Sequence, residues 1–294
     1  MTPAPIAIIG LGLMGEVYAQ RLLDAGFTVS GYDVDAARRA RLAEIGGKPA
    51  DSIAGLAKTA RAIIVAVFST AQVEDVIENH LLPALGEASN KIVMVMSTCD
   101  PDEVAGLAAR VTPRGIRYLD VPVSGTSDQV RRGDGVALIG GDAKIADEVA
   151  DLFDALFARR FHVGKIGDGG RAKLAVNLIL GLNRLALAEG LVFAERMGLD
   201  PAAFLDVAKG SASYSQVMDT KGHKMVQGDF SPEGRVKQTL KDAHMMLDQG
   251  AALGQPFLSL RIHADTLEGC VKAGEAELDN SAIIKEVRRR GSKP

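Results

Sequence analysis

Short apolar runs alternate with helical spacing of apolar residues through the first half of the chain. The run at residues 6–9 is typical of a strand that is buried on both faces of a parallel sheet. Further strands are predicted at residues 28–32, 62–67, 91–96, 117–121, 136–139 and 161–163. Helical patterns fill most of the intervals between them. This alternation predicts an α/β domain built on a doubly wound parallel sheet.

After residue 164 the pattern changes to helices alone. A long helix that is apolar around most of its circumference is predicted over residues 171–197, and shorter helices over residues 201–209, 240–252, 256–273 and 282–290. We therefore expect two domains. Residues 1–164 form the α/β domain, and residues 165–294 form an all-α domain that the long interdomain helix joins to the first.

Composition and charge narrow the class of protein. The chain has 294 residues, 47% hydrophobic residues and a net charge of −3, which is typical of a globular protein and argues against binding to nucleic acid. Two cysteines cannot form a disulfide framework, so we expect a cytoplasmic protein. We find no signal peptide and no apolar run of membrane-spanning length, and therefore expect no membrane partner. The helical half offers more apolar surface than one chain readily buries, which predicts a homodimer or homotetramer.

A glycine-rich loop follows the first predicted strand and opens a predicted helix. It reads Gly10, Leu11, Gly12, Leu13, Met14 and Gly15, a G-x-G-x-x-G pattern within a βαβ unit. Gly10 permits the tight turn, Gly12 lets the backbone approach a pyrophosphate, and Gly15 lets the helix pack close to the strand. The helix start offers free N–H groups to the phosphates. The context predicts a Rossmann dinucleotide-binding site rather than an ordinary glycine-rich turn.

The end of the second predicted strand bears on the choice of cofactor. Asp33 lies 21 residues after Gly12, where a carboxylate accepts hydrogen bonds from the ribose hydroxyls and repels a 2′-phosphate. We therefore expect NAD rather than NADP. Arg38 and Arg39 lie nearby and keep NADP open. The alternative for Asp33 is that it only caps the following turn.

Two further segments carry candidate catalytic chemistry. Ser124 and Gly125 follow the strand predicted at 117–121, where open α/β sheets bind their ligands, and they offer a hydroxyl and a backbone N–H to a carboxylate. Lys173 and Asn177 are four residues apart on the long helix and share a face. Burial there favours the neutral amine, which can exchange a proton near neutral pH. Spacing alone also allows a plain serine-capped loop and a lysine whose stem lies along apolar surface.

Four motifs in this order resemble those of the β-hydroxyacid dehydrogenase family, which includes 3-hydroxyisobutyrate dehydrogenase and tartronate semialdehyde reductase. They are the loop at residues 9–15, the segment Asp-Val-Pro-Val-Ser-Gly at 120–125, the segment 167–177, and Lys241-Asp242 with Asp248. The resemblance covers nearly the whole chain. It implies an NAD(P)-dependent oxidoreductase that interconverts a 3-hydroxy acid and its semialdehyde or keto acid. The scattered histidines have no ligand spacing, and no metal is expected.

The resemblance also implies roles for single residues. Lys173 matches the catalytic general acid and base, Asn177 the asparagine that contacts the substrate and positions this lysine, and Ser124 the serine of the substrate loop. Besides the glycine loop and Asp33, the residues that it assigns to the cofactor are Val67, Phe68, Thr98 and Lys241.

The sequence departs from the family pattern near the expected substrate. Thr126 stands where the family commonly has a second glycine after Ser124 and Gly125. Gly234 and Gln238 occupy a segment that the family usually builds around Pro-Gly-Phe. We expect Thr126 and Gln238 to contact the substrate. The gain of polar groups predicts a more polar or bulkier acid than hydroxyisobutyrate.

Two alternatives keep the fold but change the activity: an imine reductase-like enzyme, and a non-catalytic cofactor-binding scaffold. Imine reductases usually lack a lysine at the position of Lys173, and non-catalytic relatives tend to lose it. The lysine therefore favours the dehydrogenase.

Overall fold

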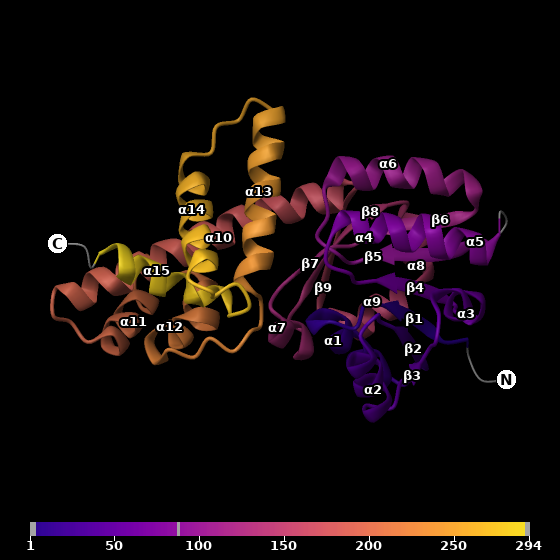
Figure 1. The fold of residues 1–294 in the computed structure, drawn as a ribbon, viewed down its shortest axis with the longest axis horizontal. Coiled ribbons are helices and arrows are strands. Elements are labelled where there is room, and N and C mark those ends of the chain that lie inside the picture. Colours follow the sequence, from indigo (N-terminus) through magenta and orange to yellow (C-terminus); the bar gives the residue numbers. More distant parts are fainter. Residues whose placement is uncertain (1–3, 87–88, 292–294) are drawn as a thin grey trace. The chain divides into compact units, whose positions relative to one another are not determined.

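The computed structural model describes residues 4–86 and 89–291. The chain divides between Lys173 and Leu174 into two compact units, an α/β unit and a helical unit (Figure 1).

Within the described residues the α/β unit contains one nine-stranded sheet in the order β3-β2-β1-β4-β5-β6-β8-β7, with β9 paired to β8. The strands through β6 are parallel, as predicted, but β8 runs antiparallel to β6. The reason is that the chain after β6 folds back through β7 onto β8, whereas a parallel neighbour requires a long crossover. The strands are β1 (Ile6–Ile9), β2 (Val29–Tyr32), β3 (Lys48–Pro49), β4 (Ala62–Val65), β5 (Lys91–Val95), β6 (Ile116–Asp120), β7 (Val123–Ser124), β8 (Val136–Gly141) and β9 (Arg159–Gly164).

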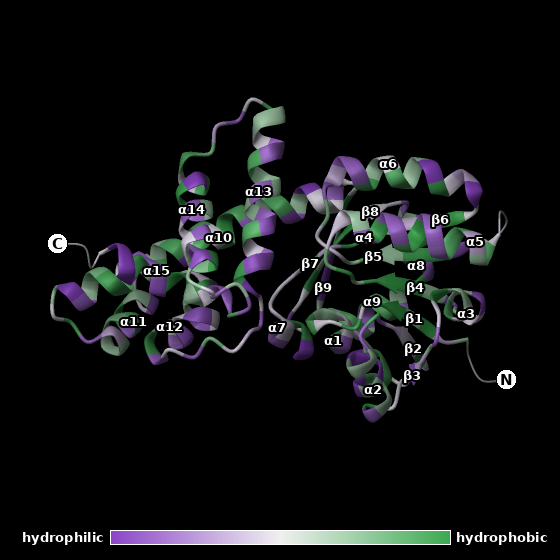
Figure 2. Cartoon of the chain, in the orientation of Figure 1, coloured by the Kyte–Doolittle hydropathy of each residue, from purple (hydrophilic) through white to green (hydrophobic). Residues whose placement is uncertain are grey.

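Helices cover both faces of this sheet. Successive side chains of a strand point to opposite faces, so Ile6 and Ile8 pack with α1 and α9, while Ala7 and Ile9 pack with α3 and α6. The apolar strands therefore lie in the middle of three layers (Figure 2). The helices of this unit are α1 (Leu13–Asp24), α2 (Ala36–Glu44), α3 (Ile53–Thr59), α4 (Thr70–Glu74), a π-helix at Asp75–Leu81, α5 (Leu82–Leu85), α6 (Pro101–Val111), a 3₁₀ turn at Thr112–Arg114, α7 (Ser127–Arg131), α8 (Ala143–Glu148) and α9 (Ala150–Leu156).

The helical unit forms around the long helix α10, with its own apolar core. The predicted helices are all present, but the sequence pattern missed a π-helix at Met218–Gly222 that continues into α12 (His223–Gln227). The others are α10 (Asp168–Arg196), α11 (Pro201–Lys209), α13 (Val236–Ala252), α14 (Leu258–Lys272), a 3₁₀ turn at Asn280–Ala282 and α15 (Ile283–Arg290).

The length of α10 corrects one expectation from the sequence. By length and composition alone, α10 could cross a membrane, and among the described residues it is the one helix of this kind. Its first turn is nevertheless fixed to the sheet of the α/β unit, and it carries the buried charged side chains of Lys173 and Arg184. We interpret it as a helix that packs within protein.

Candidate active site

The glycine loop after β1 has the shape of a phosphate cradle. Gly10 has a φ of +92°, and a Cβ on it would lie 2.6 Å from the carbonyl oxygen of Ala66. A Cβ on Gly15 would lie 1.9 Å from the carbonyl oxygen of Gly10, so only glycine lets α1 start this close to the strand. The space beside Gly12 is open up to the Arg38 guanidinium at 3.7 Å. Since α1 starts with no side-chain cap, the loop fits a dinucleotide pyrophosphate.

The Asp33 carboxylate lies directly against this loop. Its Oδ2 accepts the Leu11 N–H at 2.7 Å, and its Oδ1 accepts the Asp35 N–H at 2.9 Å. The Arg38 guanidinium lies 3.3 Å from the same Oδ2, and Arg39 donates to the Asp33 carbonyl oxygen at 2.6 Å. Asp33 thus caps the following turn and also borders the cradle, and its contact with a cofactor ribose stays a prediction.

The ends of β4 and β5 adjoin the same loop. A Cβ on Gly10 would lie 3.1 Å from Cγ1 of Val67, and the Ser97 hydroxyl donates to the Val67 carbonyl oxygen at 2.7 Å. The next residue, Phe68, is 45% exposed, and Thr98 follows Ser97 directly. Because β1, β4 and β5 are adjacent parallel strands, their ends lie at one edge of the sheet. The predicted cofactor residues of the α/β unit therefore lie on one rim.

The predicted substrate loop is more ordered than its sequence indicates. Ser124 belongs to β7 and pairs with Val136 of β8, and Gly125 has a φ of +137°. Thr126 caps α7: its hydroxyl accepts the Gln129 N–H at 3.2 Å, and its own N–H donates to Gln129 Oε1 at 2.8 Å. A substrate contact through the Thr126 N–H would have to open this capping box.

The first turn of α10 is anchored to the end of β6. Gly170 donates its N–H to Oδ2 of the buried Asp120 at 2.9 Å. Lys173 follows one turn later and is only 7% exposed, so the expected burial of this lysine is present.

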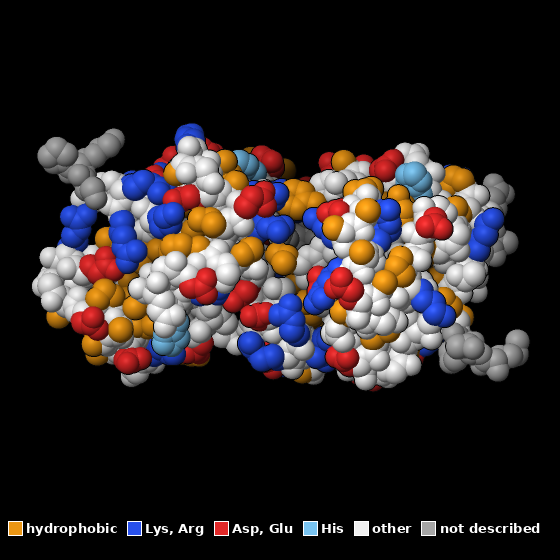
Figure 3. All heavy atoms as spheres, turned by 60° about the horizontal axis from the view of Figure 1, so that its bottom comes forward, with side chains coloured by type: hydrophobic (Ala, Val, Ile, Leu, Met, Phe, Trp, Pro, Cys, Tyr) orange, Lys and Arg blue, Asp and Glu red, His pale blue; other side chains and the backbone are white. Residues whose placement is uncertain are grey.

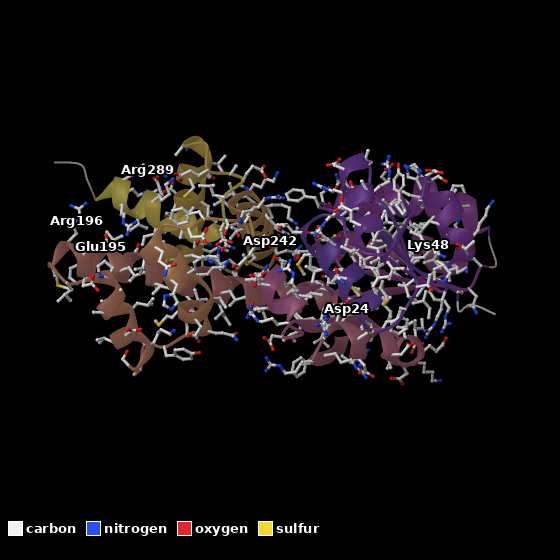
Figure 4. All side chains as sticks on the ribbon, turned by 90° about the horizontal axis from the view of Figure 1, so that it is seen from below. Asp24, Lys48, Glu195, Arg196, Asp242 and Arg289 are labelled. Atoms are coloured by element: carbon white, nitrogen blue, oxygen red, sulfur yellow. The ribbon has the colours of Figure 1, made fainter. Side chains whose placement is uncertain are left out.

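The helical unit holds Asn177 and Lys241 against one carboxylate. The Asn177 side chain donates to Asp242 Oδ2 at 3.0 Å, and the Lys241 ammonium lies 3.2 Å from Asp242 Oδ1. Asp242 is 6% exposed and projects from α13 (Figure 4). Gln238 precedes it by four residues, on the same face of α13. Sequence reasoning gave Asp242 no role, although its place directly after Lys241 was part of a motif.

Further charged groups occur in the helical unit. Within residues 4–86 and 89–291, no group of three or more His, Cys, Asp or Glu side chains is placed to hold a metal ion. Burial lowers the pKa of the Arg184 guanidinium to about 10, and the charge of Asp279 partly opposes this shift. The imidazole of His263 is also buried. Neither residue lies in the α/β unit that forms the phosphate cradle.

Comparisons with known proteins agree over both units. Residues 5–164 match the model of the NAD-binding domain of 6-phosphogluconate dehydrogenase, and residues 167–287 match the NAD-binding model of NADP-dependent 3-hydroxyisobutyrate dehydrogenase. The chain is 28% identical to 2-hydroxy-3-oxopropionate reductase of Escherichia coli, over 95% of this chain and 96% of that protein. It is 30% identical to L-threonate dehydrogenase of Cupriavidus necator, over 95% of each. A crystal structure of 3-hydroxyisobutyrate dehydrogenase from Salmonella typhimurium superimposes with a TM-score of 0.87 at 26% identity, covering 95% of this chain and 98% of that one.

Proposed function

The chain belongs to the β-hydroxyacid dehydrogenase family of NAD(P)-dependent oxidoreductases, and on this premise we propose that it oxidises a small polar 3-hydroxy acid reversibly, with NAD as the cofactor and Lys173 as the general acid and base. One observation carries the residue assignment. The buried Lys173 lies one helical turn beyond the contact that fixes α10 to the end of β6, and the Ser124–Gly125 segment follows that same strand.

The proposed mechanism divides the work among the chain's own residues. Bound NAD supplies the hydride acceptor. The glycine loop holds the pyrophosphate, while Ser124 and Gly125 hold the substrate carboxylate through a hydroxyl and a backbone N–H. The neutral Lys173 amine accepts the hydroxyl proton during oxidation, and its ammonium returns a proton during reduction. Such positioned proton transfer accelerates a reaction by about 10²–10⁴-fold.

Asn177 completes this arrangement on the next turn of α10. Its amide nitrogen donates to Asp242, so the group left for the proposed contact with the substrate is the amide oxygen, an acceptor. Lys173 and Asn177 share a face of one helix, so an acceptor on Asn177 orients a group that lies near the lysine.

The class of substrate follows from polarity and from the relatives. Two relatives are named for 2-hydroxy-3-oxopropionate and L-threonate, which are short acids with further oxygen-bearing carbons. The polar Gln238 beside Asp242 supports the same class. The test is a panel of 3-hydroxyisobutyrate, glycerate and threonate with NAD, followed by the absorbance of reduced nicotinamide. We expect a higher kcat/KM for glycerate and threonate than for 3-hydroxyisobutyrate. A clear preference for hydroxyisobutyrate would refute the substrate class, and NAD binding without any turnover would favour a non-catalytic scaffold.

The preference for NAD gives a separate prediction. The Asp33 carboxylate is buried against the loop, and a 2′-phosphate beside it would face a like charge. We expect calorimetric titration to give a Kd for NAD at least about 10-fold below that for NADP. Asp33→Ser should remove this difference, because the carboxylate that repels a 2′-phosphate is gone and the Arg38 guanidinium, which then keeps only its contact with the exposed Asp35, can face a phosphate. The control is Asp35→Ser, which alters an exposed neighbouring aspartate and should leave the preference unchanged. Tighter binding of NADP by the unaltered chain would overturn the assignment.

We also propose that residues 165–294 mediate self-association into a homodimer or homotetramer. Ile179 and Phe193 lie on one face of α10, and Met197 directly follows the helix; they are 61%, 65% and 55% exposed. Hydrophobic side chains lie at the surface of the helical unit (Figure 3). Phe193→Asp should reduce the mass found by sedimentation toward that of one chain, while Val34→Asp, on an exposed residue of the α/β unit, should not. A monomeric unaltered chain would contradict the proposal.

A further inference from the structure

Asp120 is the last residue of β6 and lies at a junction within the α/β unit. Its side chain is 2% exposed, and its Oδ2 accepts the N–H of Gly170 in the first turn of α10 at 2.9 Å. Burial raises the pKa of this carboxyl to about 6, and hydrogen bonds from the Gly170 and Gly167 N–H groups oppose the rise. Burying a carboxylate is costly, and this buried carboxylate binds the first turn of a helix.

Apart from the Asp120 carboxylate, the contact between this helix start and the sheet is made by backbone, with no room for a side chain on the helix. A Cβ on Gly169 would lie 2.8 Å from the carbonyl oxygens of both Asp120 and Leu138, and 2.9 Å from Asp120 Oδ2. A Cβ on Gly140 of β8 would lie 2.8 Å from the Gly169 nitrogen. The first turn of α10 therefore sits directly on the ends of β6 and β8, and a small displacement has nowhere to be absorbed.

The same contact fixes the place of Lys173. Residues three and four apart on a helix lie on the same face, so Gly169 and Gly170 share a face with Lys173. On the other side, Ser124 lies four residues beyond Asp120 and is held by its pairing with Val136 of β8. One buried residue thus joins the helix that carries the lysine to the strand that leads into the Ser124–Gly125 segment.

We propose that Asp120 is a positioning residue that fixes the first turn of α10, and with it the Lys173 amine, relative to the Ser124–Gly125 segment. The inference rests on the proposed role of Lys173. It assigns to Asp120 no proton transfer and no contact with substrate. A misplacement of about 1 Å of a catalytic group can cost about 10²-fold in rate, which sets the size of the expected effect.

The first test substitutes the carboxylate. Asp120→Ala should lower kcat by about 10²-fold, with the Kd for NAD unchanged and KM changed far less than kcat. Asp120→Asn keeps an oxygen for the Gly170 N–H and should restore kcat to within about 10-fold of the unaltered chain. The matched control is Asp142→Ala, which removes an aspartate that caps α8 by accepting the Lys144 N–H at 2.9 Å, and should leave kcat unchanged. All assays are made at a temperature well below the unfolding midpoint of each variant. Under these conditions the loss of a purely structural role would leave kcat intact.

The second test leaves Asp120 in place and moves the helix. Gly169→Ala adds a methyl group that meets backbone at 2.8 Å and should lower kcat, whereas Gly170→Ala meets its nearest neighbour, Pro101 Cβ, at 3.3 Å and should lower it much less. Both substitutions improve helix propensity equally, so their difference reports the contact with the sheet. This pair keeps the inference testable if Asp120→Ala does not fold.

The outcomes distinguish the positioning role of Asp120 from the proposed function of Lys173. Loss of kcat in Asp120→Ala and Gly169→Ala, with partial recovery in Asp120→Asn, supports the positioning role. An unchanged kcat in Asp120→Ala, or equal losses in Gly169→Ala and Gly170→Ala, overturns it. Full turnover by Lys173→Ala would instead refute the proposed function, whatever Asp120 does.

Discussion

Replacement of Lys173 by alanine is expected to lower kcat by about 10²–10⁴-fold and to leave the Kd for NAD unchanged. The side chain is 7% exposed, so buffer bases larger than the space left by its amine cannot easily take its place as the proton acceptor. The predicted cofactor residues of the α/β unit belong to the glycine loop and to the ends of β2, β4 and β5, whereas the substitution is made on α10. Steady-state turnover and calorimetric titration with NAD measure the two quantities separately.

The control for this variant is Lys165→Ala. Lys165 precedes α10 and is exposed, so its removal changes the charge of the same region without removing the buried amine. Its kcat should equal that of the unaltered chain. Normal turnover by Lys173→Ala would remove this lysine from the mechanism, and loss of NAD binding would show that the residue supports the cofactor site instead.

Acid is expected to destabilise the helical unit through His263. This side chain is 1% exposed, its Nδ1 has no hydrogen-bond partner among the described residues, and a Cβ on Gly181 would lie 2.8 Å from its Nε2. Burial, and secondarily the charge of Arg184, lowers the pKa of the imidazole from 6.5 to about 3. The imidazole of His263 is therefore neutral in the folded protein at neutral pH.

The sign of the pH effect follows from this shift. The unfolded chain binds a proton at His263 near pH 6.5 and the folded chain only near pH 3, so the stabilising effect is complete above pH 6.5 and is lost as the pH falls below it. The full shift corresponds to about 5 kcal/mol, of which about 2 kcal/mol is lost between pH 6.5 and pH 4.5.

Urea unfolding over a pH series measures this loss. His263→Gln should be less stable than the unaltered chain at neutral pH, because it places an amide in a site shaped for imidazole, and the difference between the two should shrink as the pH falls. His80→Gln, at an exposed histidine of the α/β unit, is the matched control for the loss of an imidazole. A constant difference between His263→Gln and the unaltered chain across the series would show that His263 does not titrate as argued.

The sequence predicted the elements whose signals are local. The apolar runs of β1, β4 and β5 are buried on both faces, so their composition alone identified them. The cradle was also predictable, because Gly10 and Gly15 are required by contacts within one βαβ unit. The sequence did not predict the two-residue strands β3 and β7, because these strands exist only through their pairing with β2 and β8.

The same limit applies to the candidate site. Thr126 was assigned to the substrate from its place after Ser124, but the reciprocal bonds with Gln129 show that it also caps the N-terminus of α7. The sequence Thr-x-x-Gln was the signal for this capping box, and it was available. In contrast, nothing in the sequence indicates that Asp120 meets Gly170, because the contact joins residues fifty apart and depends on the order of β6 and β8.

Chemical rescue of Lys173→Ala tests the central claim most directly. Small primary amines such as methylamine are added to the variant together with NAD and the preferred hydroxy acid, and kcat is measured against amine concentration and pH. The account predicts that turnover rises with the concentration of the neutral amine and regains the pH dependence that the unaltered chain shows. Turnover in the variant that equals that of the unaltered chain without any amine, with the same pH profile, would contradict it.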